Sequence, residues 1–250
     1  MIPNSELLEN IIQIALDASK IVMKHYNNQI IELKQDNSPV TQADKETDCF
    51  IKQELQKLTP DIDIITEETQ NNENVIKEYF WLVDPIDGTK EYIKKTGDFT
   101  VNIGLIKNRK PIMGVIVTPI NNKVWAGLVS KGAFCIENNK RRNISVRNFD
   151  KNNLTVVASK NHRSPELETY INDLNPYHEI SVGSSLKFCA IAEGHADIYP
   201  RLGTTMEWDT AAGHAIVLAS GGNMITYDNK EFLYNKKNFK NTWFIAKGKI

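Results

Sequence analysis

A run of strand-like segments follows two helical ones, and this order limits the architectures open to the chain. After residue 60 the sequence reads DIDIIT, YFWLVD, FTVNIGLI, IMGVIVTP and VWAGLV, separated by clusters of Gly, Asn and Lys. Before them, apolar residues recur at three- and four-residue steps over 5–24 and about 41–58, which predicts two amphipathic helices. Short strands in succession after two helices predict an antiparallel or mixed sheet with helices packed on it.

The second half of the chain alternates strand and helix signals. We expect helices at SPELETYINDL, SSLKFCAIAE and WDTAAGHAIVLAS, and strands at LTVVAS, HEISV, ADIYP, NMITY and TWFIAK. Between the halves, IENNKRRNISV is polar and basic enough to be an exposed connection. The sequence therefore predicts one domain over 1–250, with a helical and β-rich half over about 1–140 and an α/β half over 141–250.

Three sequence signals mark where helices begin. Ser5 is a plausible cap for the first helix. Thr41 stands three residues before Asp44, which is the spacing of a capping box at the start of the second helix. Pro165 stands in the first turn of the helix expected at SPELETYINDL.

Composition excludes several classes of function. Thirty basic and 31 acidic side chains leave a formal charge of -1, so nothing steers the chain toward nucleic acid or an anionic membrane. No apolar run approaches the ~18 residues that a membrane span requires, and the acidic residues near the N-terminus argue against a signal or transit peptide. Three widely spaced cysteines suggest neither a disulfide framework nor a zinc site, which favours a reducing cytoplasm.

Carboxylates stand at the ends of apolar segments in four places: Asp44, Glu67 with Glu68, Asp84 with Asp87, and Asp209. Each has an ordinary structural interpretation as a helix cap, a solvated side chain or part of a turn, and for Asp44, Glu68 and Asp209 taken singly that interpretation is the stronger one. Asp84 is harder to explain in this way. It follows a continuous apolar strand directly, where burying a charge is costly unless a cation compensates.

A hard cation would compensate for the buried charge of Asp84. The oxygen donors near Asp84 and Asp87 include the carbonyl of Ile86, and no His or Cys lies nearby in sequence, which suits Mg²⁺ better than zinc or copper. Gly88 lacks a Cβ, so the amides of Gly88 and Thr89 can approach an anion closely. Cations and backbone donors aimed at one point predict a phosphate site, with the Thr89 hydroxyl placed to orient a water.

The same residues resemble a known family. DPIDGT, preceded by EE, followed by an aromatic residue and much later by WDTAAG, is similar to the lithium-sensitive, magnesium-dependent phosphatases that include inositol monophosphatase, fructose-1,6-bisphosphatase and the 3'(2'),5'-bisphosphate nucleotidases. DNSPVTQAD, GSSLKFC and YPRLGTTMEWDTAAGHA look most like the CysQ-type nucleotidases, which remove the 3'-phosphate of 3'-phosphoadenosine 5'-phosphate (PAP). Tyr92 stands where the family commonly has phenylalanine, and it keeps the aromatic ring.

The resemblance implies a fold, a cofactor and a set of site residues. The fold would be the α/β (α+β) layered αβαβα sandwich of the sugar phosphatases. Two or three Mg²⁺ ions would be held by Glu67, Asp84, the Ile86 carbonyl, Asp87 and Asp209. Glu67 and Thr89 would position the attacking water, and Asp44 would touch a further metal through water in the outer part of the site.

The resemblance also implies how a phosphorylated nucleotide would bind. The amides of Gly88 and Thr89 would hold the scissile phosphate beside Glu67, Ile86, Asp87 and Asp209. Lys187 and Arg201 are candidates for the rest of the nucleotide, although a basic residue beside a helix is more often a surface charge.

The expected reaction is hydrolysis of PAP to AMP and phosphate, and also of 3'-phosphoadenosine 5'-phosphosulfate (PAPS), by an activated water without a phosphoenzyme. An inositol monophosphatase or related sugar-phosphate phosphatase would carry the same metal ligands. In haloacid-dehalogenase phosphatases one residue separates the two aspartates and the first is a nucleophile, whereas Pro85 and Ile86 both intervene here. A non-catalytic Mg²⁺ or nucleotide sensor is a further alternative. Monomer and homodimer are both compatible with the resemblance, as is a peripheral association with the inner membrane.

Overall fold

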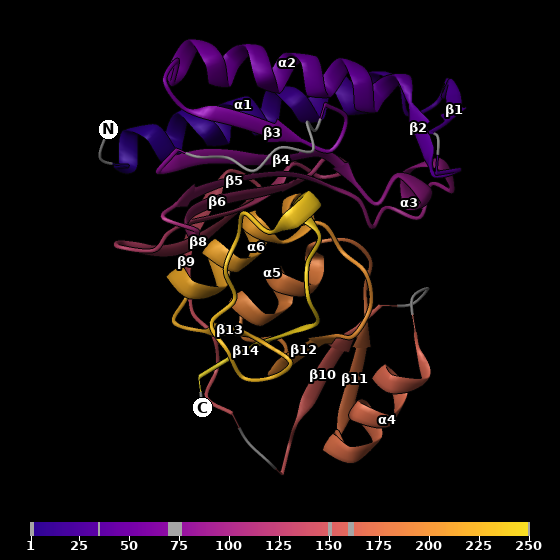
Figure 1. The fold of residues 1–250 in the computed structure, drawn as a ribbon, viewed down its shortest axis with the longest axis vertical. Helices are drawn as coiled ribbons and strands as arrows, with labels where there is room; N and C mark the ends of the chain where they lie inside the picture. Colours follow the sequence, from indigo (N-terminus) through magenta and orange to yellow (C-terminus); the bar gives the residue numbers. More distant parts are fainter. Residues whose placement is uncertain (1–2, 35, 70–76, 150–151, 160–162, 250) are drawn as a thin grey trace.

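The computed structural model describes residues 3–34, 36–69, 77–149, 152–159 and 163–249. Five layers of helix and sheet alternate along its long axis (Figure 1). Helices α1 (Ser5–Lys24) and α2 (Gln42–Leu58) form the first layer, a seven-stranded sheet the second, α5 (Leu186–Ala192) and α6 (Glu207–Ala219) the third, a five-stranded sheet the fourth, and α4 (Pro165–Leu174) the last. The predicted αβαβα sandwich is confirmed.

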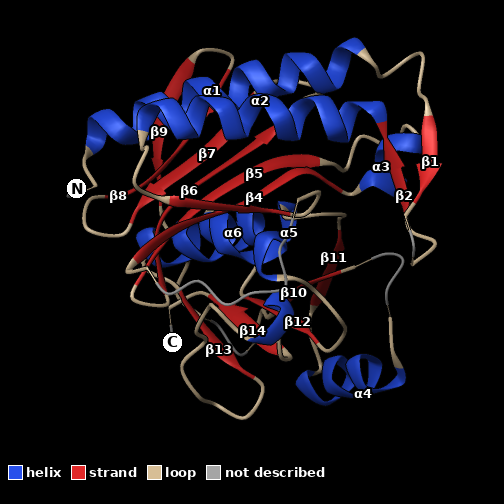
Figure 2. Cartoon of the chain, turned by 45° about the horizontal axis from the view of Figure 1, so that its top comes forward, coloured by secondary structure: helices blue, strands red, loops and turns tan. Residues whose placement is uncertain are grey.

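The first sheet is mixed, which is one of the two arrangements that the sequence predicted. Its strands lie in the order β3 (Asp63–Thr66), β4 (Tyr79–Asp87), β5 (Thr100–Lys107), β6 (Lys110–Thr118), β7 (Lys123–Leu128), β8 (Gly132–Glu137) and β9 (Lys140–Ile144). β3 and β4 are parallel, and every later pair is antiparallel. Figure 2 shows α1 and α2 side by side across one face, where Ile11 and Ile51 share a core with Trp81.

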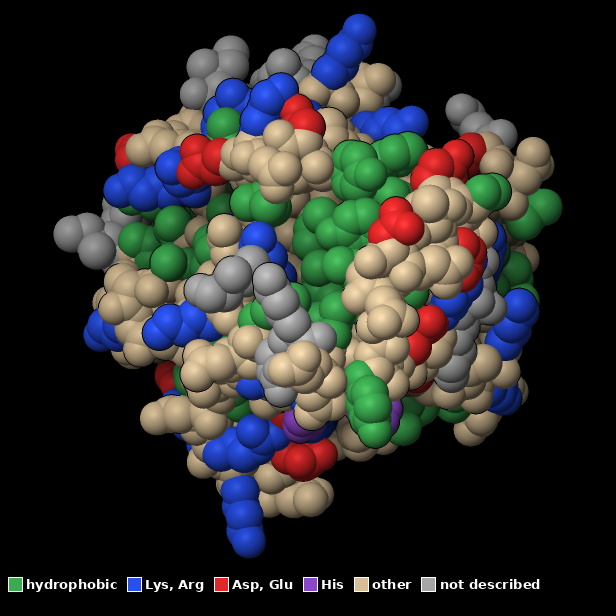
Figure 3. Space-filling model, turned by 90° about the horizontal axis from the view of Figure 1, so that it is seen from below, with side chains coloured by type: hydrophobic (Ala, Val, Ile, Leu, Met, Phe, Trp, Pro, Cys, Tyr) green, Lys and Arg blue, Asp and Glu red, His purple; other side chains and the backbone are tan. Residues whose placement is uncertain are grey.

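The second sheet combines parallel and antiparallel pairs. Its order is β11 (His178–Ser181), β10 (Thr155–Ala158), β12 (Ile198–Arg201), β14 (Phe244–Lys247) and β13 (Asn223–Thr226). Figure 3 looks at the end of the molecule opposite α1 and α2, and shows apolar side chains gathered in the middle of that face with charged ones around them. No helix among the described residues is long and apolar enough to cross a membrane.

The helix starts agree with the sequence signals in one case and differ in the other. Thr41 and Asp44 form the predicted capping box, in which each side chain accepts from the other's backbone N–H. The cap of α1 is Asn4 and not Ser5, because the Asn4 side chain accepts the Leu7 N–H at 2.9 Å while Ser5 is already helical.

The predicted exposed connection over 136–146 is wrong. This segment completes β8, turns at Asn138 and Asn139, and returns as β9. Both asparagines have positive φ, as a tight hairpin requires. The segment looked like a loop because β9 is the edge strand of the sheet and exposes most of its polar side chains. The sequence also gave no sign of the hairpin β1 (Ile31–Leu33) and β2 (Pro39–Thr41), or of α3 (Thr89–Ile93).

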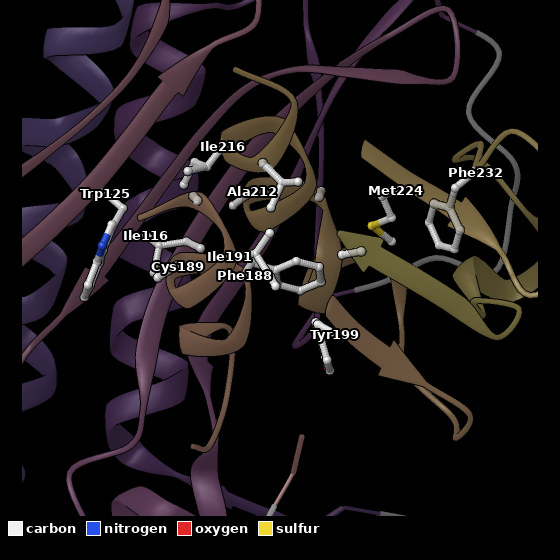
Figure 4. Packing of buried hydrophobic residues seen from close by; sticks show 14 of the residues in the cluster. Ile116, Trp125, Phe188, Cys189, Ile191, Tyr199, Ala212, Ile216, Met224 and Phe232 are labelled. Carbon is white, nitrogen blue, oxygen red and sulfur yellow. The ribbon is translucent and has the colours of Figure 1, made fainter. Parts of the chain in front are cut away.

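A row of three glycines brings α6 down onto the first sheet. Gly104, Gly114 and Gly127 are register partners across β5, β6 and β7. A Cβ at Gly114 would lie 2.2 Å from the carbonyl oxygen of Ala212, so the helix lies in direct contact with the sheet backbone. Figure 4 shows Ala212 beside the apolar side chains of α5 and the first sheet. The glycine row therefore fixes the height of α6 above the sheet.

Candidate active site

A bulge in β4 places Asp84 and Asp87 on the same face of the sheet. Side chains three residues apart on a regular strand point to opposite faces. Here Asp84 lies opposite Asn102 and Asp87 opposite Thr100, with a register shift between them. The extra residue restores both aspartates to one face. That face also carries Gly104 and therefore looks toward α6.

Both halves of the chain line one cavity of about 930 Å³ at this point. Of the residues predicted for the site, all except Asp44 contribute to its wall: Glu67, Asp84, Ile86, Asp87, Gly88, Thr89, Lys187, Arg201 and Asp209. Gly88 has φ of 95° and precedes α3, a backbone conformation that favours glycine. Asp209 comes from the first turn of α6, which the glycine row holds against the sheet.

Asp44 lies directly behind Thr89. The Thr89 hydroxyl is 3.2 Å from Asp44 Oδ1 and 3.3 Å from the Ile86 carbonyl, so it can donate to either. The other oxygen of Asp44 accepts from the backbone and the hydroxyl of Thr41 at 2.7 and 2.6 Å. Asp44 is buried, and its side chain caps α2 with one oxygen while it contacts Thr89 with the other.

The carboxylates of the cavity repel one another. Burial raises the pKa of Asp84 well above its usual range, and the neighbouring negative charges raise it further: Glu67, Asp87, Asp209 and Asp44. Burial and the charge of Asp87 likewise raise the pKa of Asp209. Buried charges of one sign normally require a cation or a proton between them.

A lysine that the sequence analysis missed supplies part of that positive charge. The ammonium of Lys34, at the turn of the β1–β2 hairpin, lies 2.7 Å from Glu67 Oε1 and 2.7 Å from Glu68 Oε1. Burial alone would lower the pKa of Lys34, but the two glutamates raise it above its usual value. No sequence pattern marked this residue, because the hairpin itself was not predicted.

Two serines before α5 were also missed as individual residues. The hydroxyls of Ser184 and Ser185 donate to Asp87 Oδ2 at 2.8 and 2.6 Å. They lie in the GSSLKFC segment, which carried the family resemblance but whose serines had no role in the sequence analysis.

The surface-charge interpretation is wrong for Lys187. This side chain is only 5 % exposed, donates to the Ser184 carbonyl at 2.6 Å and lies over the ring of Tyr199. Burial lowers the pKa of Lys187 to about 8. Arg201, on β12, donates to the Thr204 carbonyl, and its buried Nε has no hydrogen-bond partner. Both cations belong to the wall of the acidic cavity.

The donor set of the cavity fits a hard cation, although the side chains are not gathered into a cage. Among the described residues, no three Asp, Glu, His or Cys side chains stand close enough to hold an ion as they are. Each carboxylate uses one oxygen locally: Asp84 accepts the Ile86 N–H at 3.0 Å, and Asp209 the Met206 N–H at 2.8 Å. Carboxylates with one backbone carbonyl are the ligands that Mg²⁺ prefers, and their mutual repulsion favours its binding.

Comparisons with known proteins agree with this site. The chain matches the model of the inositol monophosphatase family over residues 4–243. It is 41% identical over 244 residues to the 3'(2'),5'-bisphosphate nucleotidase CysQ of Escherichia coli strain K12, covering 95% of this chain and 98% of that one. The same nucleotidase of Buchnera aphidicola is 39% identical over 96% of this chain and 93% of its own length.

A solved structure shares the whole fold. The crystal structure of CysQ from Bacteroides thetaiotaomicron, described as a bacterial member of the inositol monophosphatase family, superposes with a TM-score of 0.86. It is 34% identical and covers 98% of both chains. The chain belongs to the inositol monophosphatase family.

Proposed function

We propose that this chain is a magnesium-dependent 3'(2'),5'-bisphosphate nucleotidase that hydrolyses PAP to AMP and phosphate, and PAPS in the same way. The curated relatives that carry this activity in their names match it over nearly their whole length. The observation that carries the proposal is the convergence of Glu67, Asp84, Asp87 and Asp209 on one cavity with Gly88 and Thr89.

Glu67, Asp84, the Ile86 carbonyl, Asp87 and Asp209 would hold two or three Mg²⁺ ions, which would neutralise charge on the phosphate and lower the pKa of a bound water. The chain's own groups would orient the reactants. When the Thr89 hydroxyl donates to Asp44, its lone pairs face other partners, so it can accept a hydrogen bond from the attacking water. Glu67 would accept a hydrogen bond from the other hydrogen of this water.

The scissile phosphate would be held by the amides of Gly88 and Thr89. Gly88 has a left-handed backbone conformation there, and a Cβ on it would meet the Asp98 carbonyl. Attack by water in one step leaves no covalent phosphate on the protein. The family assignment and the bulge between Asp84 and Asp87 support this route over the nucleophilic aspartate of haloacid-dehalogenase phosphatases.

The basic residues of the cavity favour a nucleotide bisphosphate over inositol phosphate. Lys187 and Arg201 add two cations to the wall that Glu67, Asp84 and Asp209 also line. A substrate with a second phosphate could pair with them, whereas inositol monophosphate has no second phosphate to offer. We also propose a cytoplasmic location, because the three cysteines are free thiols.

Asp84→Asn tests the proposal. We expect phosphate release from PAP at saturating Mg²⁺ to be lost, while circular dichroism and the Tm show an intact fold. Asp17→Asn, on the exposed side of α1, is the control and should keep full activity. Full activity of Asp84→Asn would contradict the site, and an aspartyl-phosphate trapped on Asp84 in the wild type would contradict the mechanism.

A further inference from the structure

One oxygen of Asp87 is the meeting point of the two halves of the molecule. Asp87 Oδ2 lies within hydrogen-bond distance of three donors: the Ser184 hydroxyl at 2.8 Å, the Ser185 hydroxyl at 2.6 Å and the Asn102 amide at 3.3 Å. Asn102 belongs to β5 of the first sheet, and the serines precede α5. Ser184 lines the cavity, but Ser185 and Asn102 do not, so these two act from behind the site.

Behind Asp87, hydrogen bonds link Thr100 to Asn102, Asn102 to Ser185, and Ser185 to Asp87, each residue donating to the next. The Thr100 hydroxyl has two oxygens within reach, Asn102 Oδ1 at 2.9 Å and Ser184 Oγ at 2.7 Å. When Thr100 donates to Asn102, it turns the amide so that its NH₂ group faces Ser185, and the Ser184 hydroxyl can donate to Thr100 in place of Asp87. Asn102 Nδ2 donates to Ser185 Oγ at 2.8 Å. Because Ser185 accepts this bond, its one proton points away from Asn102, and the nearer of the two acceptors in reach is Asp87 Oδ2 at 2.6 Å, with the Asp209 carbonyl at 3.1 Å. Thr100, Asn102 and Ser185 are each at most 1% exposed, so water does not compete for these groups.

The same hydroxyl reaches the second wall of the cavity. Ser185 Oγ lies 3.1 Å from the backbone carbonyl of Asp209, in the first turn of α6. A single side chain therefore touches the residue at the end of β4 and the residue at the start of α6. These are two of the proposed cation ligands, and they come from opposite halves of the chain.

We propose that Ser185, oriented by Asn102, is a positioning residue that sets the separation of Asp87 and Asp209 and turns the remaining oxygen of Asp87 toward the cation site. With Oδ2 engaged by Ser185 and Asn102, Oδ1 is the oxygen of Asp87 left for a cation. Partners behind a metal ligand typically change metal affinity by about 10- to 100-fold. The inference rests on the proposed function only in taking Asp87 and Asp209 as cation ligands.

The test is Mg²⁺ binding to Ser185→Ala, measured by calorimetry without substrate. We expect binding weaker by about 10- to 100-fold, a kcat that recovers as Mg²⁺ is raised, and an unchanged KM for PAP at saturating Mg²⁺. Ser185→Thr, which keeps the hydroxyl, should restore much of the affinity. Ser220→Ala is the matched control, because it removes a buried serine hydroxyl that bonds Val217 far from the site.

Wild-type Mg²⁺ affinity in Ser185→Ala, or an equal loss in Ser220→Ala, would overturn the inference. If Ser185→Ala does not fold, Thr100→Val decides: it keeps the shape of the side chain and removes the bond that orients Asn102, together with the contact between Thr100 and Ser184. It should weaken Mg²⁺ binding in the same direction, and no change would overturn the inference. If the wild type binds Mg²⁺ and Ser185→Ala weakens it, but PAP is not hydrolysed, the proposed substrate fails while the positioning role stands.

Discussion

Replacing Gly114 by Ala is expected to damage the site through the contact between α6 and the first sheet. The added Cβ would lie 2.2 Å from the Ala212 carbonyl oxygen, whereas ordinary contact begins at 3.4 Å. The helix and the sheet must therefore separate by 3.4 − 2.2 = 1.2 Å, or distort by an equivalent amount. Overpacking of this kind costs about 1–3 kcal/mol of unfolding free energy.

The displacement matters because Ala212 is three residues after Asp209 on the same helix. A shift at Ala212 moves Asp209 away from Asp84 and Asp87, which stay on β4. A misplacement of about 1 Å can cost a rate roughly 100-fold. We expect kcat/KM for PAP to fall by about that factor in Gly114→Ala, beyond any loss caused by unfolded protein.

Gly127→Ala separates this effect from simple destabilisation. Its Cβ would meet Ala219 and Ile216, at the end of α6 that lies away from Asp209. Urea unfolding followed by tryptophan fluorescence gives the stability loss of each variant, and phosphate release gives the rate. Both variants should be less stable, but Gly127→Ala should keep most of its kcat/KM. Equal kinetic losses in the two variants would refute the view that the glycine row positions Asp209.

Three further outcomes follow from the charges of the site. Because the folded-state pKa of Asp84 is raised, the stability it contributes is present below pH 3.8 and lost as pH rises through the raised pKa. Asp84→Asn should therefore raise the Tm of the EDTA-treated protein at pH 8. An unchanged or lower Tm would contradict the repulsion. Lys187, with its pKa lowered to about 8, should lose its charge above that pH, so the KM for PAP should rise there in the wild type and less in Lys187→Arg. Lys34→Met removes a cation from Glu67 and should lower the Mg²⁺ concentration for half-maximal activity, whereas Lys45→Met, which removes an ion pair to the same hairpin, should not.

The layers and the acidic residues could be predicted because their signals are local. Apolar periodicity identified α1 and α2, runs of β-branched residues identified most strands, and DPIDGT stands on a single strand end. The edge strand β9 could not be recognised, because exposed polar residues such as Lys140 and Arg142 look the same in a loop and in an edge strand. Its pairing with β8 is a property of the assembled sheet.

The supporting residues of the site could not be predicted, because their roles depend on contacts between distant segments. Lys34 meets Glu67 across 33 residues, and Ser185 meets Asp87 across 98. Lys187 illustrates the same limit: its sequence neighbours do not reveal that it is buried against Tyr199. The family resemblance of DPIDGT and WDTAAG predicted which carboxylates meet, while the fold decides how each is held.

The most direct test of the nucleotidase function compares phosphate release from PAP, inositol 1-phosphate and fructose 1,6-bisphosphate at saturating Mg²⁺, with and without Li⁺. We expect the highest kcat/KM for PAP, inhibition by Li⁺, and the largest drop for PAP when Lys187 is replaced by Met. If PAP is the poorest of the three substrates, the proposed function is contradicted.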